Sequence, residues 1–590
     1  MSAVLEAHEP SAKYLSALQP KLVQHFELLG TAPGGVVPLR ELILTLAVQG
    51  NLGTQDPSDE PASELLKDIQ AEKERLIAAK TLKREKDEPA LSEDALPFDL
   101  PGSWSWVALG AVIDIVRGIT FPATHKTKEP APGRIACLRT SNVQQIIEWD
   151  DLLFVERSFM GREDQLIQHH DIVMSMANSR ELVGKVALIE QIPHAEATFG
   201  GFLGVLRPRK IDPRYAMAVL RTPYARGMLI DSSSQTTNIA NVSLAKLRPL
   251  PFPLPPAAEQ ARIVARVEEL MHLCDALETH GQLEAAQHAQ LVQTLLGALT
   301  ASATPDELAD KWQRVATHFD LLLDRPQAVD ALEQTILQLA VRGLLVPQDP
   351  NDEPASVLLQ KIRSEKDRLI AEGKIKRDKS VIPNTEEEAP FALPLGWERV
   401  TIDTLANVGS GTTPSRDNPN FFSDGLIPWV TSGETGKPFI AETAQHVTDA
   451  ALAQTSLTVY PVGTLIVAMY GQGKTRGQIS ELQIEATTNQ ACAAIVLVEP
   501  SPTHRSFVKL VFEKSYEEMR ELSAGGAQPN LNVGKIKSTL IPLPSMAEQA
   551  RIVARVESLR RLCTDLRQRL AARQTTQAHL ADALVASVNT

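Results

Sequence analysis

The stretch that comes closest to a reactive motif spans residues 468–475 and reads Ala-Met-Tyr-Gly-Gln-Gly-Lys-Thr. A phosphate-binding loop needs glycine where Ala468 stands, and it opens a helix whose backbone amides face the phosphate. Here residues 476–479 follow, a run that predicts a turn into a strand. We therefore expect a loop between strands rather than a nucleotide site. Its basic and amide side chains, set among glycines, suit contact with a polyanion.

Two further groups of residues suggest chemistry but lack part of the pattern that it needs. Residues 418–421, Asn-Pro-Asn-Phe, are similar to the Asn-Pro-Pro-aromatic tetrapeptide of amino-methyltransferases, but the third position differs and no glycine-rich methyl-donor loop precedes it. A turn is the favoured interpretation. His169 and His170 are adjacent, so on a strand they point to opposite faces, which argues against a metal site. We expect no catalytic residue and no metal ligand in this chain.

The composition is that of a folded chain with several domains. It has 590 residues, of which 43% are hydrophobic and 22% charged, and no apolar run is long enough to cross a bilayer. The N-terminus lacks the pattern of a signal peptide. The cysteines lie far apart without metal-ligand spacing, so we expect no disulfide framework and a cytoplasmic protein: they are Cys137, Cys274, Cys492 and Cys563. The net charge of −13, taken alone, argues against a nucleic-acid partner.

The chain is a tandem duplication. Residues 46–50, Leu-Ala-Val-Gln-Gly, return 293 positions later as Leu-Ala-Val-Arg-Gly, and residues 56–63 return almost unchanged at the same offset. Residues 258–268 recur identically as 547–557. Between these shared blocks the two copies keep a common skeleton but differ at most positions. The pattern indicates two similar frames that carry two dissimilar inserts.

Apolar spacing predicts helices in the frames and short strands in the inserts. From Ile263 and Ile552 onward, apolar residues step alternately by four and three, which is typical of a coiled-coil seam. Cys274 and Cys563 occupy equivalent seam positions, where we expect small buried side chains rather than reactive thiols. The helical block before each insert is broken by an Asp-Pro turn. Buried strands are predicted at residues 171–176, 186–189 and 464–469.

These elements predict an α+β chain with five parts. Two α/β modules are separated by long antiparallel helices of coiled-coil type, in a pseudo-two-fold arrangement in which the chain ends meet. The parts are residues 1–100 (helices and linker), 101–255 (the first module), 256–393 (central helices and linker), 394–544 (the second module) and 545–590 (terminal helix). The first module carries 17 Lys and Arg against 14 Asp and Glu, and the second 11 against 14, so the acidic excess lies outside the modules.

Both modules begin and end on the same sequence motifs. Each begins with Leu-Pro-x-x-Trp, at residues 100–104 and 393–397, and each is followed by Pro-Leu-Pro and then Ala-Glu-Gln-x-Arg-Ile-Val. In this duplicated order the motifs resemble the specificity subunit of type I restriction-modification enzymes, over nearly the whole chain. The resemblance implies a non-catalytic subunit whose two target-recognition domains each read one half of a split site in double-stranded DNA, with the helices setting the gap.

The same resemblance implies the partners and cofactors. Two copies of a DNA adenine methylation subunit and an endonuclease/translocase subunit are expected, and no membrane. S-adenosylmethionine, ATP and Mg are expected on those partners, with no cofactor bound by this chain.

Side-chain chemistry then selects candidate DNA contacts at predicted strand ends and loops, because base edges are read by Arg, Lys, Asn, Gln, Ser and Thr. In the first module they are Arg139, Ser141, Asn142, Arg180 and Lys185. In the second they are Thr431, Ser432, Lys437, Tyr470, Gln472, Lys474, Arg476, Asn489 and Gln490. For any one of them a solvated surface position is an equal alternative. Two other functions stay open, a single-chain restriction-methylation enzyme with unrecognised chemistry and a coiled-coil adaptor without DNA specificity.

Overall fold

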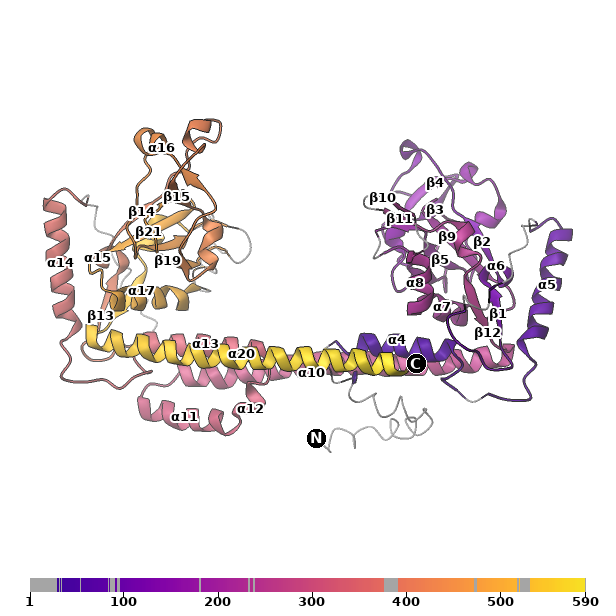
Figure 1. The fold of residues 1–590 in the computed structure, drawn as a ribbon, viewed down its shortest axis with the longest axis horizontal. Coiled ribbons are helices and arrows are strands. Elements are labelled where there is room, and N and C mark those ends of the chain that lie inside the picture. The colour runs from indigo at the N-terminus through magenta and orange to yellow at the C-terminus, as the bar shows by residue number, and fades with distance from the viewer. Residues whose placement is uncertain are drawn as a thin grey trace. The chain divides into compact units, whose positions relative to one another are not determined.

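The computed structural model describes residues 29–30, 32, 34–53, 55–82, 84, 91–92, 96–179, 182–231, 234–236, 239–375, 391–471, 475–516, 519 and 531–588. Its contacts divide the chain into two compact units (Figure 1). Unit 1 comprises residues 1–284 and 574–590, and unit 2 comprises residues 285–573. None of the described helices is long and apolar enough to cross a membrane.

Unit 1 contains the first module between two helical elements and the start of a long helix. A four-stranded sheet has the order β2-β9-β5-β7, and a three-stranded sheet has the order β4-β3-β8. The bounds are α4 (Val36–Val48), α5 (Ala62–Ala78), β1 (Ser105–Ala108), α6 (Leu109–Val112), β2 (Ile113–Arg117), β3 (Arg134–Leu138), β4 (Leu153–Glu156), β5 (Ile172–Ser175), β6 (Ala177–Asn178), β7 (Val186–Leu188), β8 (Ala197–Phe199), β9 (Leu203–Pro208), α7 (Pro213–Arg221), α8 (Pro223–Asp231), β10 (Ser234–Thr236), β11 (Ile239–Asn241), α9 (Leu244–Leu247), β12 (Pro251–Leu254) and α10 (Ala257–Thr300).

Unit 2 repeats this plan with the second module. Its sheets have the orders β14-β21-β18-β19-β16 and β17-β15-β20. The bounds are α11 (Pro305–Thr317), α12 (Phe319–Leu322), α13 (Pro326–Val341), α14 (Ala355–Ala371), β13 (Glu398–Thr401), α15 (Ile402–Leu405), β14 (Ala406–Ser410), β15 (Ile427–Val430), β16 (Phe439–Ile440), β17 (His446–Val447), α16 (Asp449–Gln454), β18 (Leu465–Ala468), β19 (Ile479–Leu482), β20 (Thr487–Thr488), β21 (Cys492–Leu497), α17 (Pro502–Lys514), α19 (Val533–Lys537), β22 (Leu540–Leu543) and α20 (Met546–Val588).

The two modules share one strand topology. The ladder β2-β9-β5-β7 of the first corresponds to β14-β21-β18-β19 of the second, and β3 pairs parallel with β8 as β15 does with β20. The predicted strands at 171–176, 186–189 and 464–469 are β5, β7 and β18. The α+β class and the internal duplication are thereby confirmed.

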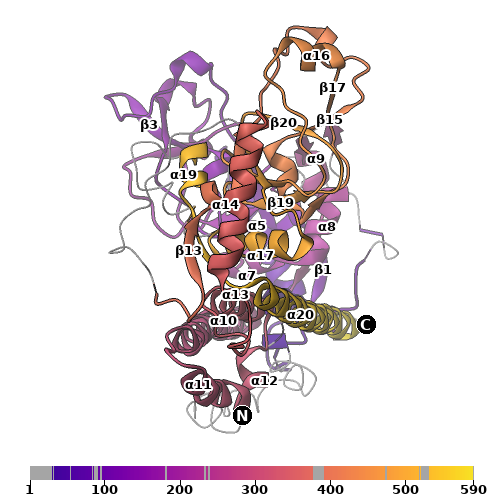
Figure 2. The same ribbon diagram turned by 90° about the vertical axis from the view of Figure 1, so that its left-hand side faces the viewer.

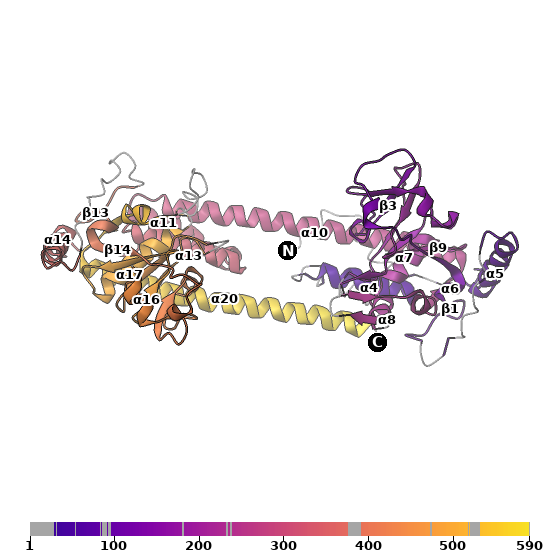
Figure 3. The same cartoon turned by 90° about the horizontal axis from the view of Figure 1, so that it is seen from above.

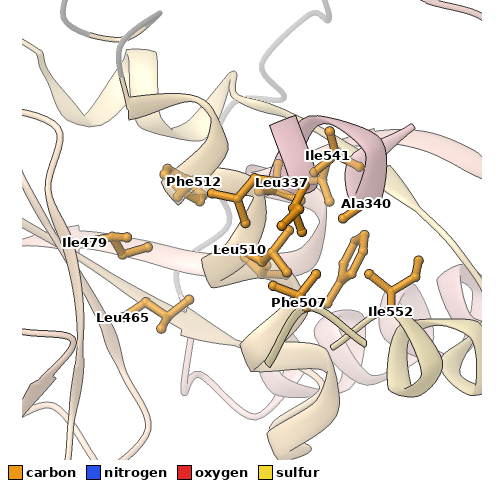
Figure 4. Packing of buried hydrophobic residues seen from close by; sticks show 14 of the residues in the cluster. Leu337, Ala340, Leu465, Ile479, Phe507, Leu510, Phe512, Ile541 and Ile552 are labelled. Atoms are coloured by element: carbon orange, nitrogen blue, oxygen red, sulfur yellow. The ribbon is translucent and has the colours of Figure 1, made fainter. Parts of the chain in front are cut away.

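Each unit has its own hydrophobic core, and each core includes the end of a long helix that begins in the other unit. In unit 1, Ala581 near the end of α20 joins the cluster that contains Leu39 and Leu42 of α4. In unit 2, Val292 and Leu299 near the end of α10 join the cluster around α13 and α17. Figure 4 shows that core, where side chains from several elements meet: Phe507 and Phe512 from α17, Leu337 from α13 and Ile552 from α20.

The predicted seam residues of both long helices are buried or half-buried. Figure 3 shows α10 and α20 each as an uninterrupted helix. Cys274 is fully buried and Cys563 nearly so, which matches the expectation of small packed side chains. Burial raises the pKa of the Cys274 thiol to about 11, so it stays protonated and poorly nucleophilic at neutral pH. All four cysteines are free and buried.

The helix that precedes each module is attached to it by a lysine. Figure 2 shows α14 running alongside the second module. Lys366 of α14 donates from Nζ to the carbonyl oxygen of Ala406 at 3.0 Å and also contacts that of Asp403. The equivalent Lys73 of α5 donates to the carbonyl oxygen of Gly110 at 2.7 Å. Both lysines thus satisfy backbone carbonyl groups where the first strands of the module meet.

Each module begins and ends on one short antiparallel ribbon that is joined to the first turn of a long helix. In the first module β1 pairs with β12, and Trp104 donates from Nε1 to Glu259 Oε2 of α10 at 2.8 Å. Gln55 donates to the other carboxylate oxygen, Oε1, at 2.7 Å. The carboxylate therefore connects the turn before α5, the start of the module and the helix that follows it. We call this triad the first clasp.

The second module repeats the arrangement. Trp397 donates from Nε1 to Glu548 Oε2 at 2.9 Å, and Gln348 donates to Glu548 Oε1 at 2.6 Å, which we call the second clasp. Burial raises the pKa of both Glu259 and Glu548, and the hydrogen bonds from the tryptophan and glutamine oppose that rise. In both copies, the tryptophan of the motif Leu-Pro-x-x-Trp thus contacts the glutamate of the motif Ala-Glu-Gln.

We expect the substitution Glu548→Gln to destabilise unit 2 by about 1–3 kcal/mol, because an amide can accept only one of the two N–H bonds and turns its own N–H toward the other donor. The loss is measured as a lower midpoint of thermal unfolding, followed by tryptophan fluorescence. Glu268→Gln is the matched control, since Glu268 is exposed and paired with Arg214 on the surface, where such pairs contribute little. Equal midpoints for both variants would contradict the role of the clasp.

Candidate nucleic-acid interface

Most of the candidate side chains of the second module lie at one edge of its sheets. The parallel strands β15 and β20 end at Val430 and Thr488, so Thr431 and Asn489 follow them on the same side. Strand β18 ends two residues before Tyr470, whose amide donates to the carbonyl oxygen of Ala491 at 3.4 Å. We call the residues after these three strand ends, with the equivalent residues of the first module, the carboxyl edge.

A short 3₁₀ helix, Ser432–Gly436, forms part of this edge in the second module. Glu434 holds it in place, because its Oε2 accepts from the amide of Thr431 at 2.6 Å and its Oε1 accepts from the amide of Ala444 at 2.9 Å. The side chain of Lys437 at the end of this helix is exposed. The helix is thus positioned by an internal carboxylate while Lys437 stays available.

The other candidates of the second module differ in exposure. Tyr470 is 37% exposed, Gln490 is exposed, and Thr431, Ser432, Asn489 and Arg476 are half-buried. Gln472 and Lys474 lie outside the described residues. Residues 475–478 form a turn into β19, as the sequence predicts, and no helix follows the glycine-rich stretch among the described residues.

The first module has an equivalent edge after β3 and β8, and Asn142 is buried within it. Its Oδ1 accepts from the amide of Arg139 at 2.9 Å, and its Nδ2 donates to the carbonyl oxygens of Glu148 and Asp150 at 3.0 and 2.9 Å. The amide group is therefore used within the loop, as the carboxylate of Glu434 is in the second module. The geometry gives Asn142 a structural role within the loop, and its contact with DNA stays a prediction.

The remaining candidates of the first module vary in their contacts. Arg139 pairs with Asp151 at 2.7 Å and is half-buried. Lys185 donates from Nζ to Gln144 Oε1 at 3.2 Å. Ser141 is exposed, and Arg180 lies outside the described residues.

Sequence reasoning missed two residues at this edge, Gln144 and Phe202. The side chain of Gln144 meets Lys185, and Phe202 lies in the turn after β8 with 71% of its surface exposed. A side-chain amide six residues beyond the end of β3 carried no signal of its own. A phenylalanine in an apolar run reads as core until the strand ends are known.

The other motifs form ordinary local structure. Asn418 accepts from the amide of Asn420 at 3.2 Å and precedes a single 3₁₀ turn. His169 contacts the carbonyl oxygen of Glu190 at 3.2 Å. In the part of the chain that the structure describes, no group of three or more His, Cys, Asp or Glu residues is placed to hold a metal ion.

Comparison with known proteins connects this geometry to a family. Residues 101–287 and 394–573 match the family model of the type I restriction modification DNA specificity domain, so that the two matches contain the two modules and the first part of each long helix. This chain is a type I restriction-modification specificity subunit. The shared strand topology, and the tryptophan and glutamate of each clasp, belong to the two copies of the domain, whereas Gln55 and Gln348 precede them.

Two curated relatives match the specificity subunit over nearly its whole length. The specificity subunit of the type I restriction enzyme EcoEI from Escherichia coli is 33% identical over 568 residues, which cover 93% of each chain. That of EcoAI from Escherichia coli is 34% identical and covers 94% of each chain. A chain from a solved structure of a type I R-M system is 16% identical and has a TM-score of 0.47. The match covers 84% of this chain and 99% of that one.

Membership of this family confirms the resemblance that the sequence motifs carry. Specificity subunits are non-catalytic parts of type I restriction complexes, and they bind DNA and work with methylation and restriction subunits. The individual DNA contacts stay predictions.

The role of Asn142 can be tested directly. We expect Asn142→Asp to speed amide hydrogen exchange across residues 139–151, because a carboxylate there loses both donated bonds and faces two carbonyl oxygens, a loss of about 1–3 kcal/mol. Ser141→Ala, at the exposed neighbouring position, serves as the control and leaves exchange unchanged. Unaltered protection in Asn142→Asp would show that the side chain does not hold the loop.

Proposed function

We propose that each module of this specificity subunit reads one half of a bipartite site in double-stranded DNA, while the long helices set the gap between the halves. One observation carries the proposal. The two modules have the same strand order, yet the residues at their carboxyl edges differ, as Arg139 and Thr431 do at equivalent positions. Two different surfaces on one scaffold are what two unrelated half-sites require.

The side chains at the carboxyl edge have the chemistry for this task. Lys185 and Lys437 carry positive charge, and Ser141, Tyr470 and Gln490 supply hydroxyl and amide groups. Such groups contact base edges in the grooves of DNA and phosphates along its backbone. The edge therefore offers both sequence readout and phosphate contact.

The long helices have the features of a spacer. On α10, residues 278–291 are exposed except for the half-buried His288. Along the chain they follow Leu277, which packs against the core of unit 1, and precede Val292, which packs in the core of unit 2. On α20 the corresponding stretch is residues 571–580. It follows Leu570, which packs in the core of unit 2, and precedes Ala581, which packs in the core of unit 1. A continuous helix rises about 1.5 Å per residue, so its length converts directly into a distance.

The helices also offer docking surfaces, and we assign them to two copies of a methylation subunit. Unit 2 has an apolar groove of about 670 Å³ between α11, α13 and α20, where Trp312 and Leu562 are exposed. Leu273 of α10 is the counterpart of Leu562 in the duplicated sequence. Leu273 is half-buried against the core of unit 1, so the support for a second, equivalent docking surface is the duplication of the sequence, while the groove of unit 2 has the exposed apolar side chains that mark sites of protein association.

The chemistry of the complex belongs to its partners in this proposal. S-adenosylmethionine is assigned to the methylation subunits, and ATP and Mg to an endonuclease/translocase subunit. This chain determines which DNA sequence the complex recognises, and it binds none of these cofactors. The free, buried cysteines support a reducing compartment, and we place the complex in the cytoplasm.

Mapping of methylated bases tests the proposal. The specificity subunit is expressed with its methylation subunit, and modified adenines are located by sequencing the host DNA. We expect a motif of two unrelated half-sites separated by unspecified bases. Seven residues inserted into both exposed stretches, after Glu284 and after Arg573, lengthen each helix by about 10 Å and should widen the gap by about three base pairs.

The half-sites themselves should not change, because the modules are untouched. Leu283→Gln, an exposed substitution without a change in length, serves as the control and leaves the gap as it was. A single continuous motif, or a gap that ignores the insertions, would refute the proposal.

A further inference from the structure

The turn between β8 and β9 exposes an aromatic ring to solvent. Phe202 is 71% exposed, whereas Phe199, three residues earlier, is fully buried in the core of the module. Burial of a phenyl ring is one of the larger favourable terms available to a side chain. The ring of Phe202 contributes little of this to the fold, so its role is to be sought outside the core.

The backbone around Phe202 is held firmly. The amide of Met176 donates to the carbonyl oxygen of Phe202 at 2.9 Å, and the amide of Gly200 donates to that of Leu138 at 3.0 Å. A Cβ at Gly118 would lie under 3.0 Å from the carbonyl oxygen of Gly200, so this approach requires glycine. The turn is thus preorganised, and presenting the ring to a partner costs little backbone entropy.

Phe202 belongs to the carboxyl edge of the first module. Met176, which bonds to it, follows Ser175, and the amide of Ser175 donates to the carbonyl oxygen of Lys185 at 2.9 Å. Lys185 in turn bonds to Gln144. Phe202 is therefore connected through the backbone hydrogen bonds of β5 to Lys185 and Gln144, whose side chains are of the kind that contact DNA.

The second module carries an exposed aromatic residue next to the other member of the equivalent hydrogen-bonded pair. The amide of Met469 donates to the carbonyl oxygen of Ala491 at 2.7 Å, in the place of the bond between Met176 and Phe202. Ala491 stands where the first module has Phe202, and Tyr470, next to Met469, is 37% exposed. An aromatic residue that changes position on a shared scaffold suits the reading of different sequences better than a common structural task.

We propose that Phe202 is a specificity-determining contact of the first module, and that its ring packs against the methyl group of a thymine in the major groove of its half-site. The inference rests on the proposed reading of DNA by this module. The methyl group of thymine is the one apolar group that the major groove displays, and phenylalanine is among the side chains that contact it. Burying one such group is worth about a fourfold change in affinity.

The test uses the complex of the full chain with its methylation subunits and duplexes that contain the mapped site. Each thymine of the half-site read by the first module is replaced in turn by deoxyuridine, which removes only the methyl group. We expect the wild-type complex to bind one of these duplexes about fourfold more weakly. Phe202→Ala should bind the thymine duplex more weakly and show no further loss with deoxyuridine at that position.

Leu395→Ala serves as the matched control, because Leu395 is fully exposed in the loop that opens the second module, before β13, and should respond to deoxyuridine as the wild type does. An identical deoxyuridine response in Phe202→Ala and the wild type overturns the inference, as does a half-site without thymine. If the complex still prefers its site over unrelated DNA in either case, the proposed function stands. If the wild-type complex shows no preference for its site over unrelated DNA, the proposed function itself is overturned.

Discussion

The fold depends on a buried carboxylate that ties the start of each module to the helix that follows its end. Glu259 accepts hydrogen bonds from Trp104 and Gln55, and Glu548 does the same for Trp397 and Gln348. Because a buried carboxylate is costly without partners, both donors must be present for the arrangement to be stable. The ribbon strands β1 and β12 then bring the two ends of the module together at one place. Everything between those ends can change without moving the frame.

The modules use this freedom in a specific way, keeping the backbone geometry of the carboxyl edge while changing its residues. Asn142 and Glu434 occupy equivalent positions, and both accept from a backbone amide three residues earlier. The side-chain Nδ2 of Asn142 then donates to two backbone carbonyl oxygens, whereas the second carboxylate oxygen of Glu434 accepts from the backbone amide of Ala444. Opposite hydrogen-bonding chemistry thus supports the same short helix, and the exposed neighbours are left to differ.

Much of the fold could be predicted from the sequence, because it depends on spacing along the chain. The apolar steps from Ile263 and Ile552 predicted two long helices, and residues 171–176 and 464–469 predicted equivalent strands. The clasp could not be predicted in the same way. Trp104 and Glu259 are 155 residues apart, and their motifs repeat in both copies without showing that they touch.

The candidate site was harder to predict because residue type does not reveal direction. Asn142 and Ser141 are adjacent polar residues, yet the structure buries the first and exposes the second. Phe202 was missed, since only the parallel register of β3 and β8 shows that it follows a strand end at the edge. Burial, register and the pairing of distant strands decide which polar groups are free, and none of these is local.

The central claim is that the frame is constant and the module alone selects the half-site, so the most direct measurement exchanges one module for the other. Residues 398–543 are replaced by a second copy of residues 105–254, with both clasps retained, and methylated adenines are mapped with the methylation subunit present. The account predicts a motif built from two copies of the first half-site, with the gap preserved. Persistence of the second half-site, or an assembled complex that methylates no defined motif, would contradict it.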